Sequence, residues 1–542
     1  MQLTNAGLKD KEAWAAAGYA VPQYDRAAMV EKTRQAPAWV HFGAGNIFRA
    51  FQANVAQNLL NAGVLDKGLV VAEGFDYEII SSVYDPYDNY SILVTLKADG
   101  SVEKTVVGSV AEALVAGEPG SDGFARLQQI FAQDSLQIVS FTITEKGYSL
   151  VNGRGETPPA VAEDFKNGPA HAKSYMGKVS ALLYHRFVSG AKPVAMVSMD
   201  NCSHNGDKLY HAIEAFAKAW EDNGVAQAGF HAYVNDPKKV AFPWTMIDKI
   251  TPRPDDSIVK MLQKDDIDGL KTVVTSMHTY TAPFVNAEQC QYLVIEDAFP
   301  NGRPALDKCA GGFLFTDRET VNKCERMKVC TCLNPLHTAL AVFGCLLGYT
   351  RISEEMKNPL LKKLVERIGY QEGLPVVTDP GVLSPKKFID EVINVRIPNP
   401  FMPDTPQRIA TDTSQKLSIR YGETIKNYLS NDPAKVDALS GIPLVFAGWL
   451  RYLMGIGDDG KPFELSPDPL YDTVAPYVKG IELGQAPSEE ALAKRFAPLL
   501  SNKAVFGVDL CQIHMDGKVV AAFAAMCKAP GAVAAVLASH LE

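Results

Sequence analysis

The sequence predicts an α/β fold, with a parallel-sheet domain over residues 1–290 followed by a mainly α-helical domain over residues 291–542. Three observations support this expectation. Strand-like apolar runs alternate with helical segments in the first half, whereas helical periodicity dominates after about residue 290. The length of 542 residues also exceeds what one hydrophobic core normally organises, so at least two domains are expected.

The strands of the expected sheet are short, uninterrupted apolar runs. They are Trp39–Phe42, Leu69–Ala72, Gln137–Thr144 and Pro193–Met199, and Phe48–Leu60 has the pattern of a helix between the first two. Strands that are separated by helices form βαβ units, whose strands are parallel. Because the runs do not alternate with polar residues, we expect helices to cover both faces of the sheet.

The second half of the chain contains five segments with the helical spacing of apolar residues. Several of them follow Ser, Asp, Asn or Pro, which are residues that favour helix starts. The expected helices are His337–Tyr349, Asn358–Ile368, Pro443–Met454, Ser488–Leu500 and Val519–Cys527.

The composition is that of a soluble globular chain. Hydrophobic residues make up 47% of it, charged residues 21%, and the net charge is −9. No block of Lys and Arg is present, which argues against nucleic acid or an anionic membrane as a partner. No apolar run reaches the ~18–20 residues that span a bilayer, and Met1–Trp14 lacks an apolar signal core. We therefore expect a cytoplasmic protein, a monomer or small homo-oligomer, that acts on a small molecule.

Nine cysteines are scattered through the chain, which is typical of a reducing compartment. Cys324, Cys330 and Cys332 cluster with the spacing C-x5-C-x-C, so either a zinc site or buried small side chains could explain them. Because no second ligand pair of familiar form follows, we expect no metal site.

The segment GAGNIFRA follows the first expected strand and precedes a helix. Its glycines let the backbone turn sharply and approach a pyrophosphate, and the free N–H groups of the following helix start favour an anion. The third glycine of the usual dinucleotide fingerprint is absent, because Phe48 occupies its place. The alternative is a plain glycine turn. The candidate cofactor-binding residues are Gly43, Gly45, Asn46, Ile47, Phe48 and Arg49.

An acidic residue after the second strand indicates which dinucleotide binds. Glu73 follows the expected strand and Asp76 lies three residues later, and either carboxylate could accept the hydroxyls of the adenosine ribose. Because a carboxylate at this place would repel the extra phosphate of NADP, NAD is the expected cofactor. Glu145 and Tyr148 come after another strand, near the same sheet edge, as neighbours of the cofactor or as loop residues.

The segment Lys328–His337 brings a lysine, an amide and an imidazole together. A metal-independent dehydrogenase needs a base for the alcohol proton and donors that stabilise the developing oxyanion. Lys328 could be that base if burial favoured its neutral form, and Asn334 could donate to the oxygen. The alternative is structural: Asn334 caps a helix, Pro335 occupies its first turn, and His337 is an ordinary helix residue.

Seven motifs occur in the order found in one known family. They are GAGNIFRA, TEKGY at 144–148, DN at 200–201, FPWTMIDKITP at 242–252, VIEDAFPNGRP at 294–304, LNPLHTAL at 333–340 and NPFMPDTPQRIATDTSQKL at 399–417. Together they resemble the polyol-specific long-chain dehydrogenase/reductase family, to which the mannitol dehydrogenases belong. The resemblance covers residues 37 to about 420, and the shared order makes it specific.

This resemblance implies a Rossmann-type N-terminal domain, a mainly helical C-terminal domain and NAD chemistry without a metal. It implies a lysine acid/base, two asparagines that polarise the substrate oxygen, and a histidine that orients the substrate. The catalytic residues are then Lys328, Asn334, His337 and Asn201, and the substrate-binding residues are Asp248, Arg408 and Lys416. From the residues alone, Asp248 could instead pair with Lys249 or Arg253, and Arg408 with Lys416 could form a solvated face.

One feature departs from the family pattern. The family has K-x4-N-x2-H, whereas this chain has K-x5-N-x2-H. On a regular helix one extra residue changes the facing of Lys328 by ~100°. A one-residue π-bulge would absorb the insertion, or the helix could start at Asn334 after a flexible lead-in. If neither holds, Lys323 or another base would take over.

The expected reaction is the reversible NAD(H)-dependent reduction of D-fructuronate to D-mannonate, because the chain length and the LNPLH variant favour a sugar acid. Oxidation of the polyol mannitol and reduction of tagaturonate are the alternatives within the same class of enzyme. The alternative from another class is a non-catalytic protein that binds a sugar acid or NAD on a dehydrogenase scaffold.

Overall fold

The computed structural model describes residues 1–254, 256–308 and 311–541. They form two compact units, one of residues 1–97 and 101–322 and the other of residues 98–100 and 323–542. The first unit extends beyond the expected limit at residue 290. The reason is strand pairing, because β14 (Tyr292–Glu296) pairs with β10 (Thr245–Asp248), and β15 (Leu314–Thr316) pairs with β14.

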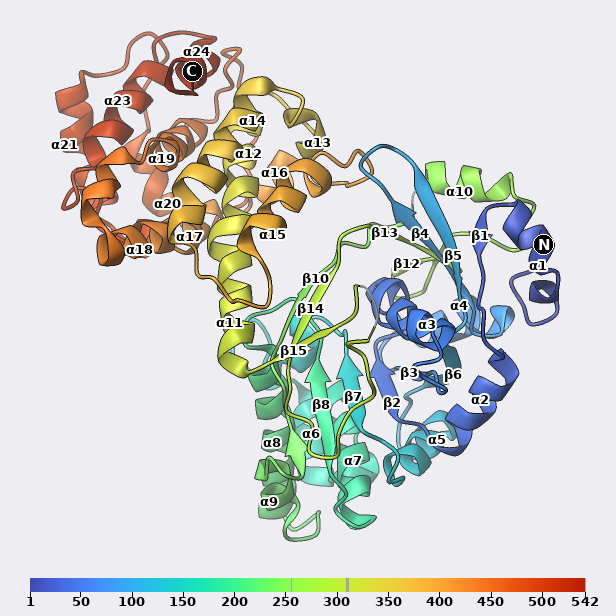
Figure 1. The fold of residues 1–542 in the computed structure, drawn as a ribbon. Coiled ribbons are helices and arrows are strands. Elements are labelled where there is room, and N and C mark those ends of the chain that lie inside the picture. Colours follow the sequence, from blue (N-terminus) through green and yellow to red (C-terminus); the bar gives the residue numbers. More distant parts are fainter. Residues whose placement is uncertain (255, 309–310, 542) are drawn as a thin grey trace. The chain divides into compact units, whose positions relative to one another are not determined.

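The first unit is built on a six-stranded sheet in the order β6-β3-β2-β7-β8-β9, and every neighbouring pair is parallel (Figure 1). Numbered along the sheet strands, this is the order 3-2-1-4-5-6 of a Rossmann fold, as expected. The chain reverses its direction of winding between β2 and β7. The strands are β2 Trp39–Phe42, β3 Leu69–Glu73, β6 Val110–Val115, β7 Ile138–Phe141, β8 Val194–Ser198 and β9 Val240–Ala241.

Both faces of this sheet are covered, which explains the uninterrupted apolar runs. Val40 and Phe42 pack into a core with helices α5–α9, whereas Trp39 points into a second core with α3 and α4. The helices of this unit are α1 Lys11–Ala16, α2 Arg26–Gln35, α3 Ala53–Asn61, α4 Glu78–Val83, α5 Asp122–Phe131, α6 Pro159–Asn167, α7 Tyr175–Val188, α8 Asn205–Asp222, α9 Phe230–Asn235 and α10 Asp256–Gln263.

Smaller sheets complete the first unit. Their orders are β1-β5-β4-β13, β10-β14-β15 and β11-β12. The strands not yet bounded are β1 Tyr19–Ala20, β4 Ser91–Leu96, β5 Val102–Val107, β11 Val273–Val274, β12 Tyr280–Thr281 and β13 Phe284–Glu288.

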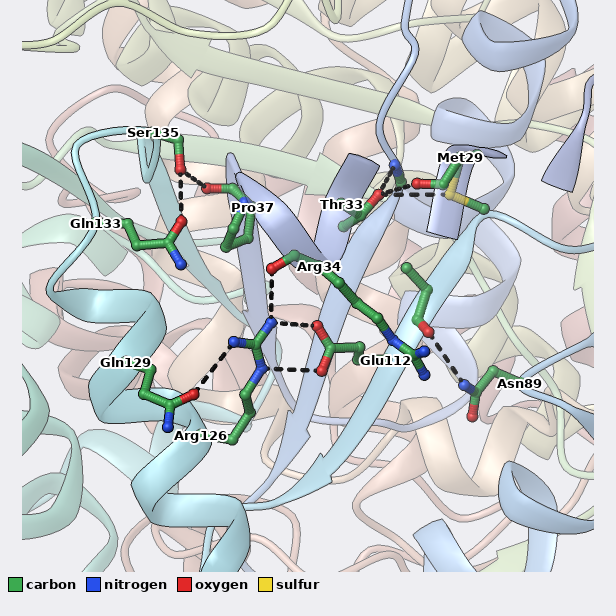
Figure 2. A network of polar contacts seen from close by, with 12 residues as sticks. Met29, Thr33, Arg34, Pro37, Asn89, Glu112, Arg126, Gln129, Gln133 and Ser135 are labelled. Carbon is green, nitrogen blue, oxygen red and sulfur yellow. Dashed lines mark hydrogen bonds and ion pairs between the residues drawn. The ribbon is translucent and has the colours of Figure 1, made fainter. Parts of the chain in front are cut away.

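The edge strand β6 is tied to two helices by one arginine (Figure 2). Arg126 of α5 donates from Nε and Nη2 to the two carboxylate oxygens of Glu112, at 3.0 and 2.7 Å. Its Nη2 also donates to the backbone oxygen of Arg34 on α2, at 2.9 Å. This planar fork holds the end of the sheet against the helices that cover it.

The second unit is mainly helical, as expected, and each of the five expected helices is present within a few residues of its limits. The helices are α11 Arg318–Met327, which begins before the division of the units, α12 Asn334–Leu346, α13 Ile352–Glu355, α14 Pro359–Glu366, α15 Pro385–Glu391, α16 Pro406–Ile409, α17 Thr413–Leu417, α18 Glu423–Asn431, α19 Gly441–Tyr452, α20 Tyr471–Val474, α21 Glu489–Leu500, α22 Lys503–Phe506, α23 Asp516–Met526 and α24 Ala532–Leu541.

Short π-helical segments interrupt the α-helices at several places. One, η2, lies in the first unit, directly before α3. The π-helical segments are η2 Phe48–Gln52, η6 Lys328–Cys332, η7 Arg367–Gly373, η9 Val392–Arg396 and η10 Ser418–Gly422.

The elements α11, η6 and α12 form one long helix, Arg318–Leu346. It begins well before the helix that the apolar pattern predicts in this region, His337–Tyr349. By length and composition it could cross a membrane, and it is the one such helix among the described residues. However, 83% of its most apolar window is buried inside the protein, which is typical of a core helix.

Candidate functional site

A cavity of about 610 Å³ lies in the first unit at the point where the winding of the sheet reverses. Its walls come from the carboxyl ends of three strands, with Gly43 after β2, Glu73 ending β3 and Thr142 after β7. Helix α7 contributes Tyr175. In open parallel sheets this edge is where dinucleotides bind.

The glycine segment meets the cavity through its two glycines only. Gly43 has a φ of +106°, and a Cβ on it would lie 2.3 Å from the backbone oxygen of Thr142, so no side chain fits. A Cβ on Gly45 would meet no atom within 4 Å, which leaves its backbone open to a ligand. The sequence motif therefore places bare backbone at this wall of the cavity.

The residues after the second glycine, Asn46 to Arg49, are not among the residues that line the cavity. Phe48 is fully buried and its ring stacks on His41 at 4.4 Å. Arg49 is also fully buried, and its guanidinium donates to the backbone oxygen of Ala282 and to Asn46 Oδ1. The side chains of Phe48 and Arg49 thus pack into the interior, the half-buried Asn46 accepts a hydrogen bond from Arg49, and Ile47 packs against the same core.

The two candidate acids differ in their hydrogen bonds. Glu73 accepts the backbone N–H groups of Ala44, Phe75 and Asp76, so both of its oxygens are in use. Asp76 accepts the hydroxyl of Thr275 through Oδ2 at 2.6 Å, and its buried Oδ1 has no partner among the described residues. Both acids line the cavity, but Asp76 alone offers an unused acceptor.

Tyr175 is a cavity residue that the sequence analysis did not identify. Its hydroxyl is buried without a partner among the described residues, and burial raises the pKa of its phenol well above the ordinary value. The hydroxyl is therefore a permanent donor at the cavity. Its ring packs on Gly74, where a Cβ would lie 2.7 Å from the ring.

The loop after β7 forms another part of the cavity wall. Lys146 and Gly147 line the cavity, whereas Glu145 pairs with Lys208 at 2.9 Å and is not among the lining residues. Tyr148 is buried and donates to Asp200 at 2.6 Å. The neighbours of Glu145, and not Glu145 itself, therefore line the cavity.

Two predicted substrate-side residues belong to the first unit. Asn201 follows β8 and Asp248 ends β10, where it is buried. Of the two cations that were possible partners of Asp248, Lys249 donates to Glu288 and Gln291, and the guanidinium of Arg253 lies over the ring of Tyr280.

The π-helical segment η6 begins at Lys328. Leu333 N–H donates to the oxygen of Lys328 at 3.0 Å, a bond that spans five residues, and the α-helical pattern resumes where His337 N–H bonds Leu333. The extra residue between Lys328 and Asn334 is therefore absorbed by a π-turn, the first of the two expected solutions. Lys328 is buried.

The structure does not show the side chain of Asn334 capping a helix. Asn334 is the first residue of α12, Leu333 precedes it, and no side-chain bond caps this helix start within the described part of the chain. Pro335 does occupy the first turn, as the capping interpretation required. The amide of Asn334 is therefore not committed to a cap.

His337 lies in a cationic environment inside the second unit. The pKa of its imidazole is lowered to about 4, mainly by burial; Asp404 opposes this shift, and Arg396, Arg420 and Arg408 add to it. The imidazole is therefore neutral at pH 7. Three guanidinium groups therefore lie near His337, together with the carboxylate of Asp404, which pairs with Arg408.

Arg408 and Lys416 belong to the same surroundings. Arg408 forms an ion pair with Asp404, and Lys416 donates to the backbone oxygen of Thr411. Burial lowers the pKa of Lys416, and the neighbouring Arg420 adds to this effect. Arg408 is exposed, as the solvated-face alternative requires, whereas Lys416 is half-buried and has the carboxylates of Asp412 and Asp468 as well as the Arg420 guanidinium near it.

The cysteines near Lys328 are buried thiols. Burial raises the pKa of Cys324 and Cys332 to about 12 and that of Cys330 to about 11. A raised thiol pKa disfavours the thiolate that metals bind. In the described parts of the chain no group of three or more His, Cys, Asp or Glu residues could hold a metal.

Comparison with known proteins identifies the family. Residues 37–308 match the mannitol dehydrogenase Rossmann domain, and residues 320–527 match the mannitol dehydrogenase C-terminal domain. The D-mannonate oxidoreductase of Thermotoga maritima is 51% identical, over 98% of each chain. The chain belongs to the mannitol dehydrogenase family. The family and the fold class that the motifs predicted are thereby confirmed.

More distant members of the mannitol dehydrogenase family extend the comparison. The D-mannonate oxidoreductase of Escherichia coli is 29% identical, over 90% of this chain and 93% of its own. Among solved structures, the Pseudomonas fluorescens mannitol 2-dehydrogenase, in a ternary complex with NAD and D-mannitol, matches with a TM-score of 0.66. It is 26% identical, over 99% of each chain.

Four residues were missed by sequence reasoning. Tyr175 and Asp200 act at the cavity and its loop, and Arg396 and Arg420 lie around His337. Arg396 and Arg420 each sit in a π-helical segment, as Lys328 does. Such segments are common at functional sites, but they leave no simple periodic mark in a sequence.

Proposed function

We propose that this protein is an NAD(H)-dependent oxidoreductase that interconverts D-fructuronate and D-mannonate. The observation that carries the proposal is the 51% identity with a D-mannonate oxidoreductase over 98% of both chains. The class of enzyme follows from the family to which both domains belong.

The first unit binds the dinucleotide. Bare backbone at Gly43 and Gly45 suits a pyrophosphate, and the unused oxygen of Asp76 suits the ribose hydroxyls of NAD. Tyr175 donates to the same ligand. NAD(H), when bound, accepts or delivers the hydride. Both carboxylate oxygens of Glu73 already accept backbone N–H groups. We therefore propose that the ribose hydroxyls bind Asp76.

The acid/base work is proposed for Lys328. In reduction its ammonium gives a proton to the carbonyl oxygen of the substrate, and in oxidation its amine takes the proton back. The amides of Asn334 and Asn201 donate to that oxygen and stabilise its developing charge. The neutral imidazole of His337 orients the substrate, and Asp248 binds a substrate hydroxyl.

The cationic group around His337 supports a sugar acid as the substrate. The guanidinium groups of Arg396, Arg408 and Arg420 lie near His337, and guanidinium groups bind carboxylates with two parallel hydrogen bonds. D-Fructuronate carries a carboxylate that mannitol and fructose lack. We therefore place the substrate carboxylate with these arginines and with Lys416.

The test is NADH absorbance during incubation with D-fructuronate, fructose or tagaturonate. Rapid NADH oxidation with fructuronate alone is the expected result. Fastest turnover with fructose would instead indicate mannitol 2-dehydrogenase activity, and with tagaturonate a tagaturonate reductase. Measurable NADH binding without turnover of any of them would show a non-catalytic binding protein.

The substitution Arg420→Met tests the proposed binding of the substrate carboxylate. Arg420→Met removes one guanidinium, whose Nη1 donates to Thr338. We expect it to raise KM for fructuronate strongly with little change in NADH affinity.

The proposal also includes a cytoplasmic location and a monomer or small homo-oligomer.

A further inference from the structure

Thr144 has an unusual backbone conformation. Its φ is +65° and its ψ is +159°, a region that is essentially reserved for glycine. A β-branched residue there is strained, because its Cβ crowds the backbone. Such strain persists only where the surroundings impose it, and it is concentrated at ligand-binding sites.

The carboxylate of Asp200 imposes this conformation. Its Oδ1 accepts the N–H of Thr144 at 2.9 Å, and its Oδ2 accepts the N–H of Ile143 at 2.9 Å and the hydroxyl of Tyr148 at 2.6 Å. Three donors from one loop thus converge on a single carboxylate at the end of β8. No neutral side chain of this size could accept all three in this way.

The restrained loop is a wall of the cofactor cavity. Ile143, Thr144, Lys146 and Gly147 all line it, and both restrained N–H groups point to Asp200 and not to a ligand. The loop therefore contributes shape to the cavity. Asp200 also directly precedes Asn201, so the same carboxylate restrains the backbone next to that residue.

We propose that Asp200 and Thr144 are positioning residues: the carboxylate holds the loop 143–148 in a strained conformation that forms the cofactor cavity before NAD(H) binds. A preformed wall spares the ligand the cost of ordering the loop. The inference rests on the proposed use of NAD(H), and it does not depend on which sugar is the substrate.

The substitution Thr144→Gly separates this role from a structural one. Glycine adopts the same backbone without strain, and the exposed threonine side chain contributes no core packing. We expect the thermal midpoint to stay unchanged or rise, while the Kd for NADH rises at least fivefold, because the loop is free to leave its position. A purely structural role would not weaken binding in a variant of equal or greater stability.

The matched control is Ala191→Gly. Ala191 also has a positive φ, +49°, in the turn after α7, and it is not among the residues that line the cavity. This variant should change the thermal midpoint in the same direction and leave the Kd for NADH unchanged. Both Kd values come from fluorescence titration with NADH in the absence of any sugar.

The partner variant is Asp200→Asn, which removes the charge and one acceptor. It should weaken NADH binding, and the double variant with Thr144→Gly should bind NADH no more weakly than Asp200→Asn alone, since both release the same loop. NADH affinity of wild-type strength in Thr144→Gly, or full additivity of the two effects, would overturn the positioning role. Wild-type protein that fails to bind NADH would overturn the cofactor assignment as well.

Discussion

Glu73 and Asp76 show how hydrogen bonding divides the work of two similar residues. Three backbone N–H groups occupy the carboxylate of Glu73, which makes it part of the scaffold of the acidic turn. One oxygen of Asp76 remains buried and unused among the described residues, and an unsatisfied buried acceptor costs free energy until a ligand donates to it. The same chemical group is thus structural at one position and available at the other.

We expect Asp76→Asn to raise the Kd for NADH about tenfold or more, because a hydrogen bond to a charged group contributes ~1.5–3 kcal/mol. Its affinity for NADPH should fall less, since the repulsion of the extra phosphate is removed. Glu73→Gln is the control. It should lower the thermal midpoint, and it should change the Kd for NADH less than Asp76→Asn does. Fluorescence titration with both nucleotides measures this. Loss of NADH affinity in Glu73→Gln alone would reverse the assignment.

Lys328→Ala should lower kcat by about 10²–10⁴-fold, the usual contribution of a positioned acid/base, and leave the Kd for NADH unchanged. Lys323→Ala is the matched control, because Lys323 was the alternative base on the same helix. Stopped-flow or steady-state NADH absorbance reports both. Wild-type turnover in Lys328→Ala, or its loss in Lys323→Ala, would move the role to the other lysine.

At the scale of elements, the π-helical turn η6 reconciles the spacing of this chain with that of its family. The sequence motif has one residue more than the family pattern, and a regular helix would rotate Lys328 by ~100°. The bond from Leu333 N–H to the oxygen of Lys328 shows that the turn is widened to hold the extra residue. The neighbouring segments η9 and η10 place Arg396 and Arg420 in the same kind of turn.

The widened turn at Lys328 predicts opposite effects of deleting and inserting one residue. Deletion of Val329 should convert η6 to a regular helix, restore the K-x4-N spacing and keep kcat within about tenfold of the wild type, since Lys328 keeps its facing. Insertion of one Ala after Val329 should abolish turnover, because the widened turn is already used. Circular dichroism and NADH titration would verify folding. A folded deletion variant with NADH binding but no turnover would contradict the prediction.

At the scale of the whole molecule, Glu355 of α13 influences the pH dependence of stability. It is fully buried, neither of its carboxyl oxygens has a partner among the described residues, and burial raises its pKa to about 9 from 4.5. A Cβ on Gly344 would lie 2.1 Å from Glu355 Oε1, so α12 leaves room for this carboxyl. The folded state therefore keeps Glu355 protonated at pH 7.

The sign of this effect follows from linkage. Between pH 4.5 and about 9 the folded protein binds the proton and the unfolded chain does not, so this contribution to stability is complete below 4.5 and lost as the pH rises towards 9. Glu355→Gln keeps a neutral side chain at every pH. Relative to wild type it should therefore gain stability as the pH rises from 5 to 8, by on the order of 4 kcal/mol at most.

Denaturant unfolding of wild type and Glu355→Gln at several pH values measures this difference. Glu354→Gln is the matched control, because Glu354 is an exposed neighbour whose ion pair with Lys357 contributes little. Its stability relative to wild type should not change with pH over this range. A difference between Glu355→Gln and wild type that is constant from pH 5 to 8 would show that Glu355 is ionised in the folded protein.

Local patterns were sufficient for much of the fold. The runs Trp39–Phe42 and Leu69–Ala72 predicted β2 and β3 because strands buried on both faces carry uninterrupted apolar residues. The long helices followed from their apolar spacing. The first unit runs past residue 290 because β14 pairs with β10, more than forty residues earlier, and β15 in turn pairs with β14; such pairing leaves no local mark.

The sequence by itself determined the order of the motifs, and this order predicted the family. It also placed Gly43 and Gly45 between a strand and a helix, and it supplied Lys328, Asn334 and His337 as candidate catalytic residues. Only the tertiary structure decided the surroundings of these side chains. It turned Phe48 and Arg49 into the interior, paired Glu145 with Lys208, left Asp76 Oδ1 without a partner among the described residues, and widened the helix at Lys328. The physical reason is that periodicity sets which face of an element a residue occupies, whereas hydrogen-bond partners far along the chain decide whether its polar atoms remain available.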